Sequence, residues 1–254
     1  MEEVLLTQVD PELRKILLIG PEGTGKTHFI KTMPKPIYIF SFDKGIASLA
    51  GESGIKAGIF LDSDRTQPKA YREFLQKLGQ IEIGEKFRWE DGKEEAYRTL
   101  AIDGFTMLTT KIFDDAQWTN SRVNKPAEFP TWAAVKSQSQ DVINRMVKCS
   151  QYVACTVLQM SEKDELTGEL FFVPNTEGKI RDEMGAWFDA VFYTTVDKSK
   201  ENQPIWEMLL VGSARHRAKI RIPSSLRKFL KEKEPNDWAA IMDKVKAAKA
   251  EGGK

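Results

Sequence analysis

The segment Leu17–Thr27 constrains the fold of this chain more than any other part, because it reads LLIGPEGTGKT. It matches the pattern G-x-x-x-x-G-K-[ST], in which glycines let the backbone curl until successive N–H groups form a nest for an anion. In such a loop we expect Lys26 to reach the β- and γ-phosphates of a nucleotide and the Thr27 hydroxyl to bind Mg²⁺. The residues at the fixed positions are Gly20, Gly25, Lys26 and Thr27.

The flanking sequence has the secondary structure that this loop requires. Residues 15–19 are a short, mostly apolar run that favours a buried parallel strand. Residues 27–31 begin a helix, and the dipole at its N-terminus favours bound phosphate. The sequence therefore predicts a nucleotide-binding loop. We expect its contacts to come from Gly20, Pro21, Glu22, Gly23, Thr24, Gly25, Lys26, Thr27 and His28.

Composition and charge narrow the class of protein. The 254 residues suffice for one α/β domain with a full core, and 41% hydrophobic with 30% charged residues is typical of a soluble globular protein. The formal net charge of +1 means that any contact with nucleic acid must come from a local patch.

The cysteines and the termini indicate a cytoplasmic protein. Cys149 and Cys155 lack the spacing of metal ligands and favour a reducing compartment, where both are expected to be small buried apolar residues. The N-terminus lacks the features of a signal peptide, and no run approaches the 18 apolar residues of a membrane span. We expect no membrane partner.

Two further strands end in carboxylates. The β-branched and aromatic run 36–42 is followed by Asp43, and the apolar run 97–103 ends in Asp103. Ligands of open α/β sheets bind at the carboxyl ends of the strands, so Asp43 is expected beside the γ-phosphate. Asp103 is expected to hold Mg²⁺, as the strand-tip aspartate of phosphate-loop ATPases does.

A third strand, 152–158, is predicted to end at Gln159, which would face the same crevice and hydrogen-bond the γ-phosphate or the attacking water. The segment 160–182 is rich in turn residues and predicts a hairpin or a mobile loop.

The rest of the sequence predicts further elements. A lead-in arm is expected over 1–14, and helices over 66–80, 105–118, 131–148, 223–231 and 237–248. A hairpin is expected over 86–98, and antiparallel strands over 190–196 and 205–211, joined by the turn 197–203.

The segment 214–222 reads ARHRAKIRI, so an extended chain would place its four cations on one face. One interpretation is the solvated face of an edge strand, where cations block unwanted pairing. The other is a finger that reaches a neighbouring subunit's nucleotide, or a track for nucleic-acid phosphates. The four cations are Arg215, Arg217, Lys219 and Arg221.

In this order, the parts resemble the RecA-like ATPase core. The segment GPEGTGKT looks like the RecA phosphate loop, and Asp43 stands where RecA-like proteins usually carry a catalytic glutamate. Asp103 matches the Mg²⁺ aspartate, and Gln159 matches the glutamine that couples the γ-phosphate to the following loop. Lys219-Ile220-Arg221 looks like the Lys-x-Arg pair that related ring ATPases insert into the next subunit's site.

The resemblance covers about residues 12–225 and is closest to compact phage-encoded RecA-like proteins linked to single-strand annealing and recombination. It implies an α/β RecA-like core with a mainly parallel sheet and antiparallel C-terminal strands. We expect an ATPase domain over 1–231, followed by a helix and flexible tail over 232–254. The loops 119–130 and 160–182 fall where the family places its single-stranded-DNA loops. Their candidate DNA contacts are Arg122, Lys125, Lys163, Phe171, Phe172 and Lys179.

The leading hypothesis is a Mg²⁺-dependent ATPase that forms a filament or ring, with the nucleotide at the subunit interface, and acts on single-stranded DNA. A single-stranded-DNA-binding protein is a candidate partner. Two alternatives remain: a small-molecule kinase, and a nucleotide-gated assembly module with weak hydrolysis, because Asp43 is one methylene shorter than glutamate. A GTPase is excluded, since Asn124-Lys125-Pro126-Ala127 lacks the aspartate of the guanine-reading motif.

Overall fold

The structure is a computed structural model that describes residues 13–176, 180–197 and 205–252. Residues 1–12 of the expected lead-in arm lie outside the described residues, as do most of the expected turn over 197–203 and the candidate DNA contact Lys179.

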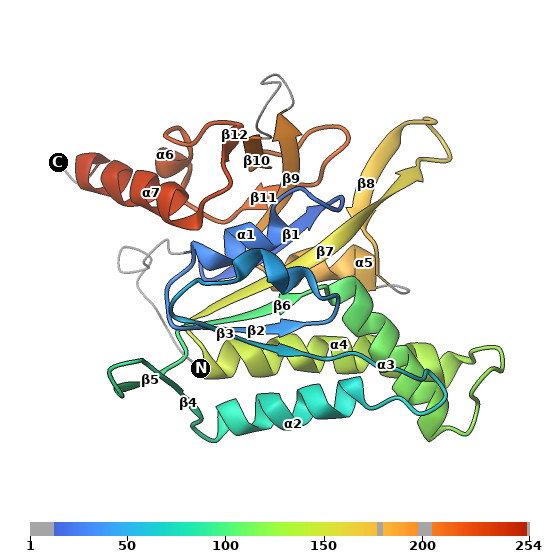
Figure 1. Ribbon diagram of the computed structural model, residues 1–254. Coiled ribbons are helices and arrows are strands. Elements are labelled where there is room, and N and C mark those ends of the chain that lie inside the picture. The colour runs from blue at the N-terminus through green and yellow to red at the C-terminus, as the bar shows by residue number, and fades with distance from the viewer. Residues whose placement is uncertain (1–12, 177–179, 198–204, 253–254) are drawn as a thin grey trace, which may run out of the picture.

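One large sheet runs through the molecule (Figure 1). Its strands are β1 (Lys15–Gly20), β2 (Ile37–Ser41), β3 (Ile55–Ile59), β6 (Thr99–Asp103), β7 (Tyr152–Lys163), β8 (Leu170–Pro174), β9 (Ala190–Asp197), β10 (Ile205–Leu209), β11 (Lys219–Ile220) and β12 (Lys233–Pro235). The strand order is β12-β10-β9-β1-β7-β6-β2-β3, with β11 paired to β9 and β8 paired to β7. Within the run β9-β1-β7-β6-β2-β3, each strand is parallel to the next. The strands β8, β10, β11 and β12 pair antiparallel with their neighbours. A separate hairpin consists of β4 (Lys86–Arg88) and β5 (Glu94–Ala96).

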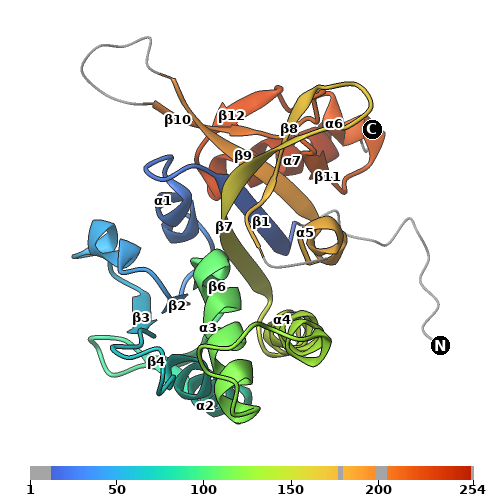
Figure 2. The same ribbon diagram turned by 90° about the vertical axis from the view of Figure 1, so that its right-hand side faces the viewer.

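Helices cover both faces of the sheet, because alternate residues of each buried strand point to opposite sides. Leu17 and Ile19 of β1 belong to one apolar core, and Ile16 and Leu18 belong to the other. The first core is closed by α2 (Ala70–Glu82), α3 (Phe105–Thr119) and α4 (Phe129–Cys149), which lie together below the sheet in Figures 1 and 2. The second is closed by α1 (Lys26–Lys31), α6 (Ser224–Arg227) and α7 (Trp238–Gly252). The short helix α5 (Ile180–Glu183) and the single 3₁₀ turns η2 (Gly45–Leu49) and η3 (Met184–Trp187) complete the described elements.

The predicted fold class is confirmed: the domain is α/β with a mostly parallel central sheet and antiparallel C-terminal strands. The strands β1, β2, β6, β9 and β10, the helices α2, α3 and α4, and the β4–β5 hairpin lie where the sequence predicts them, to within a few residues. The sequence pattern does not predict β3 or β12, which are short strands.

Two expectations about strands are wrong. The strand β7 does not end at Leu158 but continues to Lys163, because β8 pairs with this part and satisfies its backbone hydrogen bonds beyond the main sheet. The expected extended run over 214–222 reduces to the two residues of β11. Upstream of it, His216 packs against the rings of Phe172 and Tyr193.

The C-terminal segment is built into the domain. The strand β12 extends the sheet by pairing with β10, and the apolar side of α7 enters the second core through Trp238, Ile241, Met242 and Val245. The expected helix over 223–231 is much shorter, since α6 has only four residues.

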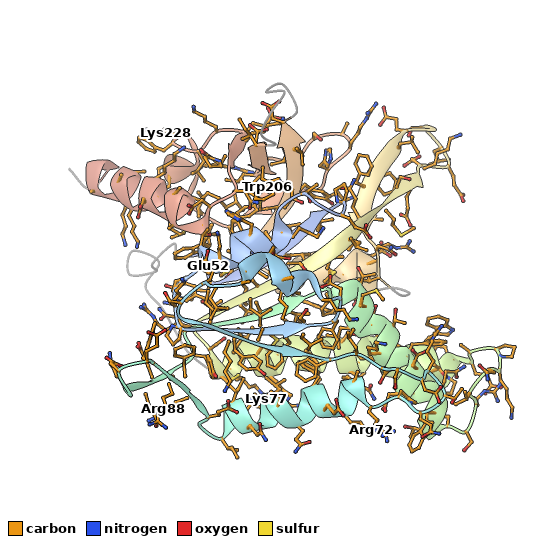
Figure 3. The ribbon with its side chains drawn as sticks, in the orientation of Figure 1. Glu52, Arg72, Lys77, Arg88, Trp206 and Lys228 are labelled. Atoms are coloured by element: carbon orange, nitrogen blue, oxygen red, sulfur yellow. The ribbon has the colours of Figure 1, made fainter. Side chains whose placement is uncertain are left out.

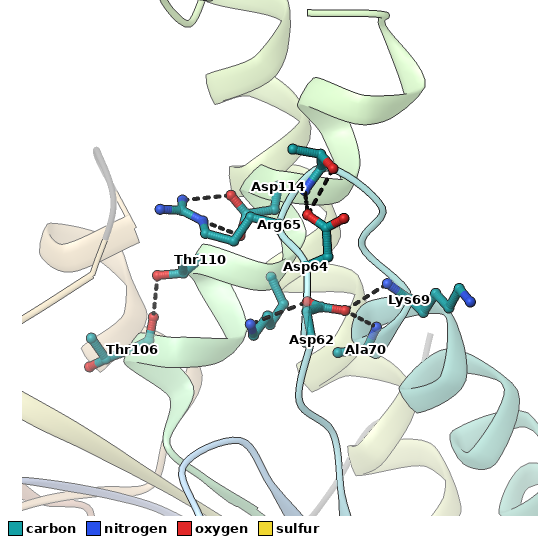
Figure 4. A network of polar contacts seen from close by, with 10 residues as sticks. Asp62, Asp64, Arg65, Lys69, Ala70, Thr106, Thr110 and Asp114 are labelled. Atoms are coloured by element: carbon teal, nitrogen blue, oxygen red, sulfur yellow. Dashed lines mark hydrogen bonds and ion pairs between the residues drawn. The ribbon is translucent and has the colours of Figure 1, made fainter. Parts of the chain in front are cut away.

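A buried ion pair between Asp62 and Lys111 joins the N-terminal end of α2 to α3 (Figure 4). Asp62 Oδ1 accepts hydrogen bonds from the backbone N–H groups of Lys69 (2.7 Å) and Ala70 (2.8 Å) at the start of α2. Its Oδ2 lies 3.2 Å from the Lys111 ammonium of α3, and the two side chains are 2% and 11% exposed. A single carboxylate thus caps one helix and neutralises a cation on the next.

We predict that Asp62→Ala lowers the free energy of unfolding by about 3 kcal/mol, since it removes a cap and leaves a buried ammonium unpaired. The measurement is urea denaturation followed by circular dichroism. The matched control is Asp64→Ala two residues on, because Asp64 is exposed and its side chain accepts hydrogen bonds from the backbone N–H and hydroxyl of nearby Thr66. It should cost less than about 1 kcal/mol. Equal losses for the two variants would contradict this account.

Candidate nucleotide-binding site

The phosphate loop joins β1 to α1 and takes backbone angles that favour glycine. Gly23 and Gly25 have φ values of 72° and 80°, in the left-handed region. Gly20 is required for a different reason: a Cβ atom there would lie 1.9 Å from Thr194 Oγ1 on β9. The loop is therefore shaped by its own dihedral angles and by close packing against the neighbouring strand.

Lys26 folds back over its own loop. Its ammonium donates hydrogen bonds to the carbonyl oxygens of Gly20 (2.9 Å) and Pro21 (2.6 Å). Burial lowers the pKa of Lys26, and the nearby carboxylates of Asp103, Asp43 and Glu22 act in the opposite direction. The ammonium is thus partly desolvated and held next to the nest of backbone N–H groups, where an anion would meet it.

Asp103 is fixed at the tip of β6 by two hydroxyl groups. Thr27 donates to its Oδ2 (2.8 Å) and Thr156 of β7 donates to its Oδ1 (2.7 Å). Thr156 in turn accepts the N–H of Gly104 (2.8 Å). Burial raises the pKa of Asp103 above its ordinary value, the hydrogen bond from Thr156 lowers it, and the charge of Asp43 raises it further.

Three oxygen atoms converge beside Gly45. A Cβ atom placed on Gly45 would lie 3.0 Å from Asp43 Oδ1, 3.4 Å from Asp103 Oδ2 and 3.5 Å from Thr27 Oγ1. Hydroxyl and carboxylate oxygens are the ligands that Mg²⁺ prefers, and Mg²⁺ is usually held by one or two carboxylates together with substrate phosphates. The donor set therefore fits Mg²⁺. No cluster of three or more His, Cys, Asp or Glu side chains suited to a metal occurs among the residues that the structure describes.

A cavity of about 570 Å³ lies over the loop. The predicted site residues on its lining are Glu22, Gly23, Thr24, Gly25, Lys26, Thr27, His28, Asp43 and Asp103. Sequence reasoning missed the others, which come from four separate parts of the chain: Gly45, Ser48, Gly104, Thr106, Met107, Thr156, Leu158 and Trp206. Thr156 carries a sequence signal, because it lies on a predicted strand three residues before its predicted end, whereas Trp206 carries none.

Gln159 is not among the described residues that line this cavity. It lies on the part of β7 that pairs with β8, opposite Pro174. Because the strand continues past it, the position is not a strand tip, and the cavity wall is formed by Thr156 and Leu158 instead.

The candidate finger residues lie at the other end of the sheet from the phosphate loop. The β11 residue Lys219 pairs with Val191, near the start of β9, which runs parallel to β1. Lys219 donates to the Gly185 carbonyl, and Arg221 donates to the Ala186 carbonyl at 3.0 Å. Since Val191 lies beside Leu17, the pair is roughly 10 Å from Gly20 along the strand direction.

The candidate DNA contacts form two separate groups, which lie apart in Figures 1 and 2. Between α3 and α4, Arg122 forms an ion pair with Glu128 (2.7 Å), and Lys125 borders a small cavity of about 180 Å³. The second group belongs to the β7–β8 hairpin, which projects beyond the sheet in Figure 1. There Lys163 is exposed, the Phe171 ring lies 4.7 Å from the Arg217 guanidinium, and the Phe172 ring is tilted against that of His216 with centroids 4.9 Å apart.

The C-terminal strands hold the outer side of the phosphate loop. The Thr24 and Thr194 hydroxyls are 2.5 Å apart, and the Trp206 indole N–H donates to the Gly23 carbonyl (3.1 Å). The Asn236 amide donates to the Gly25 carbonyl (2.8 Å). Two residues later, the Trp238 N–H donates to the hydroxyl of Thr32 at the end of α1 (2.8 Å). The loop is thus fixed by Asp103 on one side and by β9, β10 and residues 236–238 on the other.

The sequence over residues 12–222 matches the model of a family described as AAA domain. The chain belongs to this family. It is therefore a P-loop ATPase of that family, which implies nucleotide binding, typically with Mg²⁺. No curated protein sequence matches the chain.

Among solved structures, the KaiC-like protein PH0186 from the hyperthermophilic archaeon Pyrococcus horikoshii OT3 is similar to this chain. The identity is 11% and the TM-score 0.40, over 82% of this chain and 83% of that chain. Within the described residues, no helix has the length and apolar character needed to cross a bilayer.

We predict that Gly20→Ala lowers the free energy of unfolding by about 2 kcal/mol or more, because the new methyl group overlaps Thr194 Oγ1. Thermal and urea unfolding measure the loss. The second change Thr194→Ala should recover part of it, and failure to do so would contradict the steric explanation. The matched control is Gly79→Ala on α2, where a Cβ meets nothing within 4 Å. That variant should be neutral or stabilised by up to about 1 kcal/mol.

Proposed function

We propose that this protein is a Mg²⁺-dependent ATPase of RecA-like design that works as an oligomer on single-stranded DNA. The observation that carries the ATPase part is the convergence of Lys26, Thr27, Asp43 and Asp103 on one cavity. A phosphate-binding loop, a partly desolvated lysine and oxygen ligands for a metal are the parts that phosphoryl transfer from a nucleotide requires, and here they border one cavity.

The residues divide the work of phosphoryl transfer. The backbone N–H groups of the loop bind the phosphates, and Lys26 exchanges the Gly20 and Pro21 carbonyls for phosphate oxygens. Thr27 and Asp103 would hold Mg²⁺, which neutralises charge on the β- and γ-phosphates. Asp43 orients a water molecule for attack on the γ-phosphorus and accepts its proton, while the bond to the β-phosphate oxygen breaks.

The proposed fingers act on a neighbour. Lys219 and Arg221 lie at the opposite end of the sheet from their own phosphate loop, so they would stabilise the γ-phosphate bound by the next subunit. In one chain the carbonyls of residues 185 and 186 satisfy them, and assembly would exchange those carbonyls for phosphate.

The role in DNA metabolism rests on the resemblance to compact phage-encoded RecA-like annealing and recombination proteins. It is supported by the projecting β7–β8 hairpin, which leaves the sheet directly after the cavity residue Leu158. Its exposed Lys163 and the aromatic Phe171 are the kinds of residue that contact phosphates and stack on bases.

A second candidate function is a nucleotide-gated assembly module with weak hydrolysis. The observation that favours it is the position of Asp43, whose Oδ1 accepts the Gly45 N–H at 2.8 Å. An aspartate held in this way reaches less far toward a γ-phosphate than a glutamate. Asp43→Glu would then increase the hydrolysis rate, whereas a fully competent Asp43 predicts a loss.

We predict that single-stranded DNA stimulates ATP hydrolysis and that Lys26→Ala abolishes it, with a rate loss of at least about a hundredfold. The loss is expected because the lysine neutralises charge on the transferring phosphoryl group. Phosphate release is measured with and without an oligonucleotide, and Lys31→Ala on the same helix serves as control. A hydrolysis rate that is the same with and without the oligonucleotide would contradict the proposed action on DNA but not the ATPase activity.

Mixing two inactive variants in one oligomer tests whether Lys219 and Arg221 act on the nucleotide of a neighbouring subunit. Lys26→Ala retains its fingers, and the double variant Lys219→Ala/Arg221→Ala retains its lysine, so each should be inactive alone. In mixed oligomers, some sites combine an intact lysine with an intact finger pair, and we predict ATP hydrolysis well above the sum of the separate activities. An additive result would contradict action between subunits.

A further inference from the structure

Trp206 is an aromatic side chain on the cavity wall that the proposed chemistry does not use (Figure 3). It lies on β10, and its indole N–H donates to the Gly23 carbonyl at 3.1 Å. A Cβ atom on Gly25 would be 2.8 Å from its Cγ and Cδ2 atoms, so the indole ring lies against the loop backbone. The ring is half-buried and borders open cavity.

His28 forms a second aromatic surface beside it. The two ring centroids are 4.9 Å apart with an interplanar angle of 51°, and both residues line the cavity. Its imidazole therefore offers a second flat ring beside the indole on the wall of the cavity.

The order of the strands fixes the direction in which a nucleotide lies. Asp103, the proposed Mg²⁺ ligand, lies on β6, and Asp43, the proposed base, follows β2; both strands are on one side of β1. Trp206 comes from β10, on the other side of β1. A Mg²⁺ ion held by Thr27 and Asp103 would neutralise the β- and γ-phosphates, so the γ end of a triphosphate on the loop would lie toward β6 and β2. The other end, which carries the sugar and base, would then lie toward β10.

We propose that Trp206 and His28 form the binding site for the base of the nucleotide, with the purine ring stacked on the indole. The proposal rests on the proposed function, because it requires a triphosphate on the loop. Stacking on an indole offers a large apolar area, and it does not depend on the hydrogen-bonding pattern of the base.

The test separates base binding from phosphate binding. Calorimetry measures the dissociation constants of ATP and of inorganic tripolyphosphate, both with Mg²⁺, for the wild type and for Trp206→Leu, Trp206→Phe and His28→Leu. The matched control is Trp89→Leu in the β4–β5 hairpin. Trp89 is also half-buried and its ring N–H donates to a single partner, Glu95, but it lies outside the cavity.

We expect Trp206→Leu to weaken ATP binding by roughly ten- to a hundredfold and tripolyphosphate binding far less. The hydrogen bond to the Gly23 carbonyl is also lost in Trp206→Phe, so that variant controls for its loss. His28→Leu should weaken ATP binding to a smaller extent, and Trp206→Phe should keep most of the affinity because it keeps a ring. Trp89→Leu should change neither constant.

Two results would overturn the base site. Equal weakening of ATP and tripolyphosphate by Trp206→Leu would mean that the indole only braces the phosphate loop, and no change in either would place the base elsewhere. Failure of the proposed function is a different result, because the wild-type protein would then bind neither ligand.

Discussion

The hydrogen bond from Thr27 to Asp103 joins the two halves of the site. It connects Thr27, the second residue of α1, to the tip of β6, although β7 lies between β1 and β6 in the sheet. Thr156 of that intervening strand binds the other oxygen of the same carboxylate, so three neighbouring elements meet at one buried side chain. A carboxylate with this burial is stabilised in its charged form only by such donors and by nearby cations. The same contacts that secure the fold at this point therefore hold a metal ligand in place.

The parts of the site that were predicted from the sequence are those defined by local pattern. A phosphate loop is contiguous, and its glycines, lysine and threonine each have a chemical reason to occupy fixed positions. Asp43 follows one apolar run and Asp103 ends another. Parallel strands place their carboxyl ends at the same edge of a sheet, so both carboxylates were predicted to lie near the loop. These inferences need only that the strands are parallel, which their continuous apolar runs favour.

The parts that were not predicted depend on contacts between distant segments. Trp206 reaches Gly23 across 183 positions in the chain, and Asn236 reaches Gly25 across 211, so no local pattern indicates either contact. The strand β12 has only three residues, too few for an alternation of apolar and polar residues to be recognised in the sequence. Gln159 was misplaced for a related reason: β7 continues only because β8, further along the chain, supplies its hydrogen-bonding partner.

The attachment of α1 at both ends has a consequence for how the site opens. A helix of six residues has little stability by itself, because isolated helices shorter than about 12 residues are marginal in water. Here Asn236 binds the carbonyl of Gly25 at its start, and the N–H of Trp238 binds Thr32 at its end. The phosphate loop, α1 and the beginning of α7 should therefore open and close as one cooperative unit in amide hydrogen exchange, and a chain that stopped at residue 231 would lose the order of its phosphate loop together with its last helix.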